Sequence, residues 1–209
     1  MPATTKKRRT QAERTEASDK AMFKAAISLI AREGSNKMTL ASVGKKAGFS
    51  SGLVSYRFGT KSKLLQETAH KILDLWESQV VKPAIYAEER DSIENLKLLA
   101  HLYIDAVSGR SDLILAQFRL MNECYSSHKE LQPTFQEFDR RTRGRLLELI
   151  EECSKQYELN PNVDREAVTV SFVALMRGTA IQYFIDKDSI DLDDIYRAVE
   201  TLIDSLFDR

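Results

Sequence analysis

Residues 50–61 hold short polar side chains, two cations and a glycine in close succession. Hydroxyl groups bond to nucleic-acid phosphates, and an arginine fork either clamps a phosphate or reads the edge of a guanine. Gly52 lets a phosphodiester backbone approach closely, and Leu53 is suited to a thymine methyl group. Lys61 stands where a helix is expected to begin, and free backbone N–H groups there also favour an anion. The residue types predict nucleic-acid contacts from Ser50, Ser51, Gly52, Leu53, Ser55, Arg57 and Lys61.

A helix-turn-helix over residues 39–58 would hold these side chains in place. Thr39 is a good N-cap for a short helix whose apolar residues recur at helical spacing. Gly48 can end that helix, and Ser50 or Ser51 can cap a second one that runs to about Phe58. The second helix has the size that enters a DNA major groove.

The charge distribution divides the chain into two parts. Residues 1–63 hold 14 Lys or Arg and 4 Asp or Glu, a net charge of +10, and residues 64–209 carry −10. A cationic end joined to an anionic body is typical of a nucleic-acid binder with a separate second domain. We therefore predict a basic flexible arm at 1–15, able to reach phosphates or the minor groove. A DNA-binding domain at 16–62 and a ligand-binding and dimerisation domain at 63–209 follow it.

The remainder of the chain predicts only helices. Apolar residues recur at helical spacing, and no convincing strand or internal repeat is present. The fold class is therefore all-α: a three-helix DNA-binding domain followed by a larger helical bundle. The expected helices are 18–33, the pair within 39–58, 61–81, 91–107, 111–126, 130–157, 163–185 and 191–207.

The chain resembles the tetracycline-repressor (TetR) family of bacterial transcription regulators. The matching residues lie within 18–65: Thr39-Leu40, Ala47-Gly48-Phe49-Ser50, Gly52, Tyr56-Arg57-Phe58 and Lys61-Ser-Lys-Leu-Leu65. The family usually has a tyrosine at the position of Ser55, whereas here the aromatic residue follows at Tyr56. The resemblance implies operator DNA as partner, contacts that include Tyr56 and Thr39, and a homodimer.

The sequence contains no convincing pattern of catalytic or metal-binding residues. Two cysteines make no disulfide framework, and no Ser, Cys or Lys has a recognisable activating partner. Glu67 and His70 have the spacing used in di-iron bundles, but the second copy that such a site needs is missing. Cys124 and His128, at i and i+4, would supply half of a metal site, a spacing that usually arises by coincidence. We expect no catalytic residues, metal or cofactor.

An effector site is predicted among the body helices, where polar groups interrupt bulky apolar residues, the usual composition of a ligand cavity. Arg177 needs either an aspartate partner or an anionic group on an effector, because its helix is so apolar. The function predicted is a repressor released from a palindromic operator by a small hydrophobic effector; the alternative is a constitutive or architectural DNA-binding dimer. The candidate effector residues are Trp76, Tyr103, Phe118, Met121, Asn122, Tyr125, Phe172, Met176 and Arg177.

The last two helices are expected to form the dimer interface. Helix 163–185 resembles a membrane span in length, but its polar residues favour a helix buried on more than one side. No secretory signal opens the chain, so we expect a cytoplasmic protein without membrane contact. The predicted interface residues are Phe172, Ile195, Val199, Leu202, Ile203 and Leu206.

Overall fold

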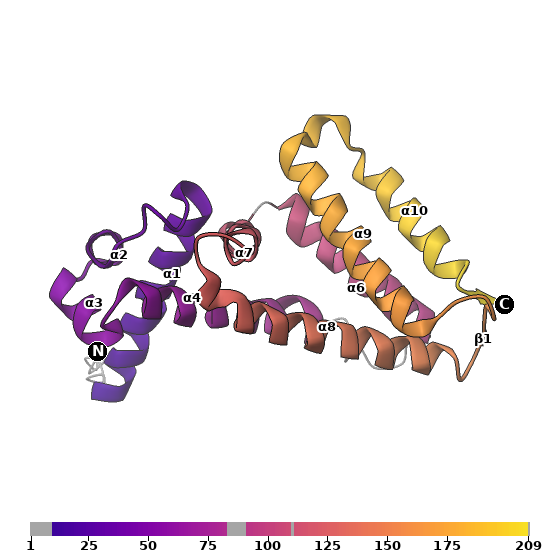
Figure 1. Cartoon of the computed structure of the whole chain (residues 1–209), viewed down its shortest axis with the longest axis horizontal. Helices are drawn as coiled ribbons and strands as arrows, with labels where there is room; N and C mark the ends of the chain where they lie inside the picture. The colour runs from indigo at the N-terminus through magenta and orange to yellow at the C-terminus, as the bar shows by residue number, and fades with distance from the viewer. Residues whose placement is uncertain (1–9, 83–90, 110, 209) are drawn as a thin grey trace, which may run out of the picture.

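The computed structural model describes residues 10–82, 91–109 and 111–208 and confirms the all-α fold class (Figure 1). The longer helices are α1 (Gln11–Glu33), α2 (Leu40–Ala47), α3 (Ser51–Phe58), α4 (Lys61–Trp76), α6 (Ser92–Ser108), α7 (Asp112–Glu123), α8 (Gln132–Cys153), α9 (Arg165–Ile185) and α10 (Leu192–Asp204). The short ones are the π-turn η1 (Glu77–Val81) and the 3-10 turns η2 (Lys129–Leu131) and η3 (Lys187–Ser189).

The helices form two groups that meet at α7. Figure 1 shows α1–α3 at one end of the molecule and α6, α9 and α10 at the other, with α7 between them. α4 leads out of the first group, and the long α8 runs beneath the second. The arrangement matches a small DNA-binding domain attached to a larger bundle.

The helix ends follow from capping residues that the sequence displays. The hydroxyl of Thr39 accepts a hydrogen bond from the backbone N–H at the third helical position of α2, and Thr60 does the same for α4. Ser50, one of the two predicted candidates, caps α3. Gly34 and Gly48 end α1 and α2 with backbone φ angles of 86° and 79°. Residues that have a Cβ atom rarely adopt such angles, whereas glycine does so readily.

The N-terminal helix is longer than the sequence predicts. α1 begins at Gln11 instead of Ser18, because Thr10 and Glu13 form a reciprocal capping box that starts the helix early. The arm predicted over 1–15 is therefore helical from residue 11. Residues 1–9, which contain its basic cluster, lie outside the described part of the chain.

Other elements also differ from the predictions. The helix expected to reach Val81 changes to a π-turn at Glu77, and the helix expected over 111–126 ends at Glu123. Two residues after α8 and two after α10 also form a short antiparallel pair, β1 (Glu158–Leu159) with β2 (Phe207–Asp208). Such brief pairing carries no period-2 pattern, so the sequence contains no signal for it.

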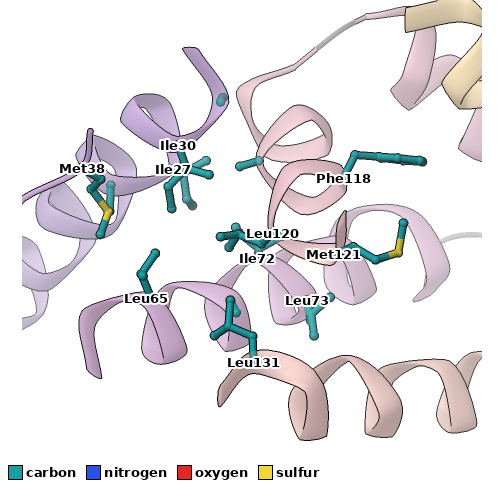
Figure 2. Close-up of a cluster of buried hydrophobic side chains, with 14 of the residues drawn as sticks. Ile27, Ile30, Met38, Leu65, Ile72, Leu73, Phe118, Leu120, Met121 and Leu131 are labelled. Carbon is teal, nitrogen blue, oxygen red and sulfur yellow. The ribbon is translucent and has the colours of Figure 1, made fainter. Parts of the chain in front are cut away.

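The two helix groups share one hydrophobic core. It runs without a break from Met22 in α1 to Phe138 in α8, and Ile30, Ile72 and Leu120 are fully buried in it. Figure 2 shows Leu120 of α7 beside Ile72 of α4, on the side that faces α1, whereas Phe118 points away from that cluster. A second cluster holds the far ends of α6, α8, α9 and α10 together.

Truncating Leu120 should therefore destabilise both domains at once. We expect Leu120→Ala to lower the free energy of unfolding by about 2–5 kcal/mol, since it leaves a cavity between three helices. The matched control is Leu53→Ala, which removes the same atoms from an exposed side chain of α3 and should change stability by about 0.5 kcal/mol or less. Urea unfolding measures both; similar losses for the two variants would contradict this account of the shared core.

Candidate DNA-binding surface and ligand cavity

The outer face of α3 is exposed to solvent and carries mainly small polar residues, together with Leu53 and Tyr56. Tyr56 is 89% exposed and Leu53 is 40% exposed, while Val54 and Phe58 on the opposite face are buried. The other predicted contacts on the exposed face are Ser51, Gly52 and Ser55. The structure thus places five of the predicted contact residues together on one helix face.

Ser50 and Thr39 are helix N-caps, in addition to any contact that they make with DNA. The hydroxyl of Ser50 accepts from the Leu53 N–H at 3.2 Å, and that of Thr39 accepts from the Ser42 N–H at 3.0 Å. Each oxygen therefore fixes the start of a helix. Its remaining hydrogen-bonding capacity faces solvent, since both residues are exposed.

Gly44 sets the distance between α2 and α3, a role that the sequence reasoning missed. A Cβ built on Gly44 would lie 2.9 Å from the Phe49 carbonyl oxygen and 3.2 Å from the Ser50 backbone. Because these neighbours are backbone atoms, a side chain here would force the two helices apart. A glycine inside the first helix of a helix-turn-helix was the available signal.

Arg57 forms an ion-pair clamp inside the domain instead of pointing outward. Its Nε lies 2.9 and 3.0 Å from the two Asp19 carboxylate oxygens of α1, and its Nη1 lies 3.3 Å from Glu67 Oε2 of α4. The hydrogen bond to Asp19 raises the pKa of Arg57, against a smaller lowering by burial. The guanidinium also lies 4.8 Å from the Phe58 ring centroid.

This geometry changes the interpretation of Arg57. A guanidinium held by two carboxylates fixes α3 between α1 and α4, so the free fork expected from the sequence is not what the structure contains. The physical reason is its place in the last turn of α3, beside the inward Phe58. Glu67, considered above as a metal ligand, is used here as the second partner of the clamp.

Lys61 also makes an internal bond. Its Nζ donates to the Asn36 carbonyl at 3.0 Å and joins the start of α4 to the loop before α2. Lys45 and Lys46, in the last turn of α2, and Lys63, in the first turn of α4, are exposed. The exposed cations of this domain therefore include these three lysines.

The second candidate site is a cavity of about 80 Å³ inside the larger domain. Five parts of the chain form its wall: the end of α4 with η1, then α6, α7, α8 and α9. The lining is mostly apolar and rich in aromatic rings, and the Trp76 and Tyr103 rings meet edge to face at 5.3 Å. Burial disfavours the charged phenolate and raises the pKa of the Tyr103 phenol.

Seven of the nine predicted effector residues line this cavity: Trp76, Tyr103, Phe118, Met121, Phe172, Met176 and Arg177. Asn122 and Tyr125 do not. Both are exposed, because Asn122 lies on the outer face of α7 and Tyr125 follows the helix end. The lining residues that the site prediction omitted are Glu77, Val81, Leu99, Gln117, Phe138, Arg141, Thr142, Arg145, Leu146 and Val173.

Several of the omitted residues lie on one face of α8. Phe138 lies three and four residues before Arg141 and Thr142, which lie four and three residues before Arg145, the intervals that align side chains along a helix. That periodicity was visible in the sequence. Nothing in it showed which neighbouring helix the face would meet.

Arg177 has the aspartate partner that was one of its two predicted alternatives. Its Nη2 lies 2.5 Å and its Nη1 3.2 Å from the two Asp139 carboxylate oxygens of α8, a two-point pair. Burial opposes the charged form, but the hydrogen bonds and charge of Asp139 outweigh it and raise the pKa of Arg177. The pair ties α9 to α8 at the cavity wall.

Polar contacts join the DNA-binding helices to the loop between α7 and α8. Ser35 Oγ, at the end of α1, lies 2.8 Å from His128 Nε2, and His128 Nδ1 lies 3.2 Å from Glu130 Oε1. Ser62 of α4 donates to the same Glu130 oxygen at 3.3 Å. Contacts with its own backbone N–H and with His128 lower the pKa of Glu130 despite some desolvation.

The half-site proposed for Cys124 and His128 is not formed. Cys124 caps the end of α7 and His128 follows the next turn, so they share no helix face. Burial raises the pKa of the Cys124 thiol, which donates to the Met121 carbonyl. Over 10–82, 91–109 and 111–208, no three His, Cys, Asp or Glu side chains are grouped to hold a metal.

The outer face of α9 is apolar and uncovered. Ile185 is 80% exposed, Val170 and Ile181 are exposed on the same side, and a Cβ on Gly178 would meet no atom within 4 Å. α9 is long and apolar enough to cross a membrane by length and composition alone, and only 22% of its most apolar window is buried. A single protomer therefore leaves one apolar side of α9 uncovered, and the predicted burial on more than one side stays a prediction about the dimer.

The predicted interface residues fall into two groups. Leu202 of α10 is 50% exposed, whereas Val199 and Ile203 are buried within the protomer against the second core cluster. The stripe on α10 is used internally because that face packs on α6. The half-buried Ile195 and Leu206 belong to the same cluster, and Phe172 lines the cavity.

Comparisons with known proteins agree with this geometry. A curated relative, the HTH-type transcriptional regulator BetI of Agrobacterium fabrum, is 24% identical over 185 residues, covering 88% of this chain and 85% of the relative. A putative transcriptional regulator from Saccharomonospora viridis, solved in complex with choline, superposes with a TM-score of 0.80 at 20% identity, over 93% of this chain and 100% of that one. The fatty acid degradation regulator FadR of Bacillus halodurans gives 0.67 at 19%, over 94% and 96%.

Two family models match the chain. Residues 23–68 match the model for bacterial regulatory proteins of the tetR family, and residues 92–208 match the BetI-type transcriptional repressor, C-terminal. The second match alone covers more than half of the sequence. The protein therefore belongs to the tetracycline-repressor family of transcription regulators, with a C-terminal domain of the BetI type.

Proposed function

We propose that this protein is a cytoplasmic, homodimeric repressor that leaves a near-palindromic operator when a small, mainly apolar effector enters the cavity. It has no catalytic role in this proposal. The observation that carries it is the position of α7, whose two faces serve two sites: Phe118 and Met121 line the cavity, and Leu120 packs against the DNA-binding helices. A constitutive dimer would have no use for a cavity at this place.

α4 provides a second connection between the same two sites. Its first two turns hold Lys61, with its contact to Asn36, and the clamp partner Glu67, and its end supplies Trp76 to the cavity. The π-turn at Glu77–Val81 also lines the cavity, and such turns often occur at functional sites. A ligand that moves α4 or α7 would therefore change the orientation of α3.

The small size of the cavity supports a mechanism in which the effector displaces part of the cavity wall. A cavity of about 80 Å³ is smaller than the engineered apolar cavity of about 150 Å³ that accepts benzene. An effector of six or more heavy atoms would need to move part of the wall. Of the five wall elements, α4 and α7 are the ones that also pack on α1.

The direct test selects an operator from random duplexes and then measures its release by a panel of metabolites. A dimer should protect half-sites whose centres lie about 10 base pairs apart, or a multiple of that. Choline belongs in the panel because a structural neighbour holds it. Equal affinity for random and selected duplexes would refute the repressor. Selective binding that no metabolite weakens would favour the constitutive alternative.

The surface of α3 yields a prediction with an internal control. Tyr56→Ala should weaken operator binding by about 1 kcal/mol or more and leave unfolding unchanged, because the side chain is almost fully exposed. Arg57→Ala should lower the free energy of unfolding by about 1 kcal/mol and weaken selected and random DNA by similar factors, because it releases α3. Fluorescence anisotropy and urea unfolding measure these effects. If Arg57→Ala instead relaxed the preference for one base at one operator position, Arg57 would contact that base directly and the clamp interpretation would be wrong.

The outer faces of α9 and α10 yield a prediction about assembly. Leu202→Glu should convert the dimer to monomers and abolish operator binding, since it places a charge on the surface that a second copy would cover. Tyr125→Glu is the matched control, because Tyr125 is an exposed apolar residue outside these helices. Light scattering gives the mass. A Leu202→Glu dimer that still binds operator would place the interface elsewhere.

A further inference from the structure

We propose that the cavity selects an organic anion with an apolar body, whose carboxylate or similar group binds Arg141. This inference rests on the proposed function, since it names the chemical class of the effector for the same site. It follows from the charges at the cavity wall and from which of them are already neutralised within the protein. The apolar body would contact the aromatic lining.

The charged lining residues are three arginines and one glutamate: Arg141, Arg145, Arg177 and Glu77. Glu77 is ion-paired with Arg145, and Arg177 has its two-point pair with Asp139. Both pairs are half-buried and well formed. A ligand that displaced either of them would leave a partner without its counter-ion.

Arg141 is neutralised least. Its nearest carboxylate oxygen, on Glu137, is 3.8 Å from Nε, beyond hydrogen-bond distance. That glutamate also makes a much closer ion pair with Arg140. The Arg141 side chain is 46% exposed, and Arg141 is the one lining residue with an exposed position. It therefore stands at the opening with a guanidinium available to an anion.

Gln117 gives an independent sign of a ligand. It is only 5% exposed, it lines the cavity, and its side-chain oxygen has no hydrogen-bond partner among the described residues. A buried amide without a partner costs free energy, which a ligand with a polar group could recover. An empty apolar void would not require a glutamine in its wall.

A cationic ligand fits this wall poorly. Aromatic rings such as Trp76 and Tyr103 can hold a quaternary ammonium group, but sites of that kind gain most when no like charge is near. Here the single lining carboxylate, Glu77, is already paired with Arg145, and Arg177 is paired with Asp139. The one lining charge without a close counter-ion is the Arg141 guanidinium, which attracts an anion and repels a cation.

Trp76 makes the test simple, because it is the only tryptophan of the chain and it lines the cavity. Its fluorescence, measured without DNA, would report the binding of hexanoate, hexanamide, hexylammonium and choline to the full-length protein. The first three share one apolar chain and differ mainly in the charge of the head group. We expect hexanoate to bind about tenfold more tightly than hexanamide, and both cations to bind more weakly than hexanamide.

A pair of neighbouring arginines provides the control. Arg141→Gln should reduce the preference for hexanoate over hexanamide to about twofold or less. Arg143→Gln, two residues away, removes the same charge from a side chain absent from the wall, leaves the Glu137–Arg140 pair in place, and should keep the preference. Circular dichroism would verify that both variants fold.

The outcomes separate this inference from the proposed function. Tighter binding of choline or hexylammonium than of hexanoate, or no binding of any probe, would overturn the anion class. Equal loss of the preference in both arginine variants would overturn the role of Arg141. None of these results bears on operator selection, which tests the repressor itself.

Discussion

The packing of α7 against α1 and α4 is the contact on which the rest of the molecule depends. Leu120 and Ile72 are fully buried where the two helix groups meet, so the core of α1–α4 continues into the larger group through α7. Close-packed interiors deform little, and a shift of one wall is transmitted to its neighbours. The DNA-binding surface and the cavity are therefore mechanically joined through a few apolar side chains, with no flexible linker between them in the described residues.

The charged residues divide into those that fix geometry and those that remain available. Arg57, Arg145 and Arg177 each bind a carboxylate on another helix, and so hold α3, η1 and α9 in place. The exposed lysines of the first domain and Arg141 of the second have no such constraint. The net charge of the N-terminal region therefore overstates the number of cations available to DNA. Part of that charge, such as Arg57, is paired with carboxylates within the domain.

Local signals in the sequence predicted the helices, and long-range contacts explain most of what it missed. Caps such as Thr39 and Thr60 act within four residues, so their effect is readable without a fold. The partners of Arg57 lie 38 residues before and 10 residues after it, on two other helices. A residue next to an inward Phe58 could face either DNA or the domain, and the choice depends on packing that no local pattern encodes.

The cavity residues also show which side chains a sequence can and cannot assign to a site. Bulky apolar residues have to be buried, and Trp76, Phe118 and Met176, which the sequence predicts as effector contacts, line the cavity. The sequence could not select Arg141, whose helix is polar on most sides and looks like a solvated surface. The same ambiguity affected α10, where one stripe serves the protomer and only Leu202 remains outside.

Energetics set a demanding condition on any effector of this site. Moving a two-state equilibrium from about 1:99 to 99:1 takes roughly 5.5 kcal/mol of differential binding. At about 25 cal/mol per Å² of apolar surface, burial alone would need roughly 220 Å² that is covered in one state and not in the other. The cavity of about 80 Å³ cannot enclose that much surface without moving its walls. Because α4 and α7 are the walls that reach the DNA-binding helices, the enlargement that gives an effector its affinity is also the displacement that would turn α3 away from the operator.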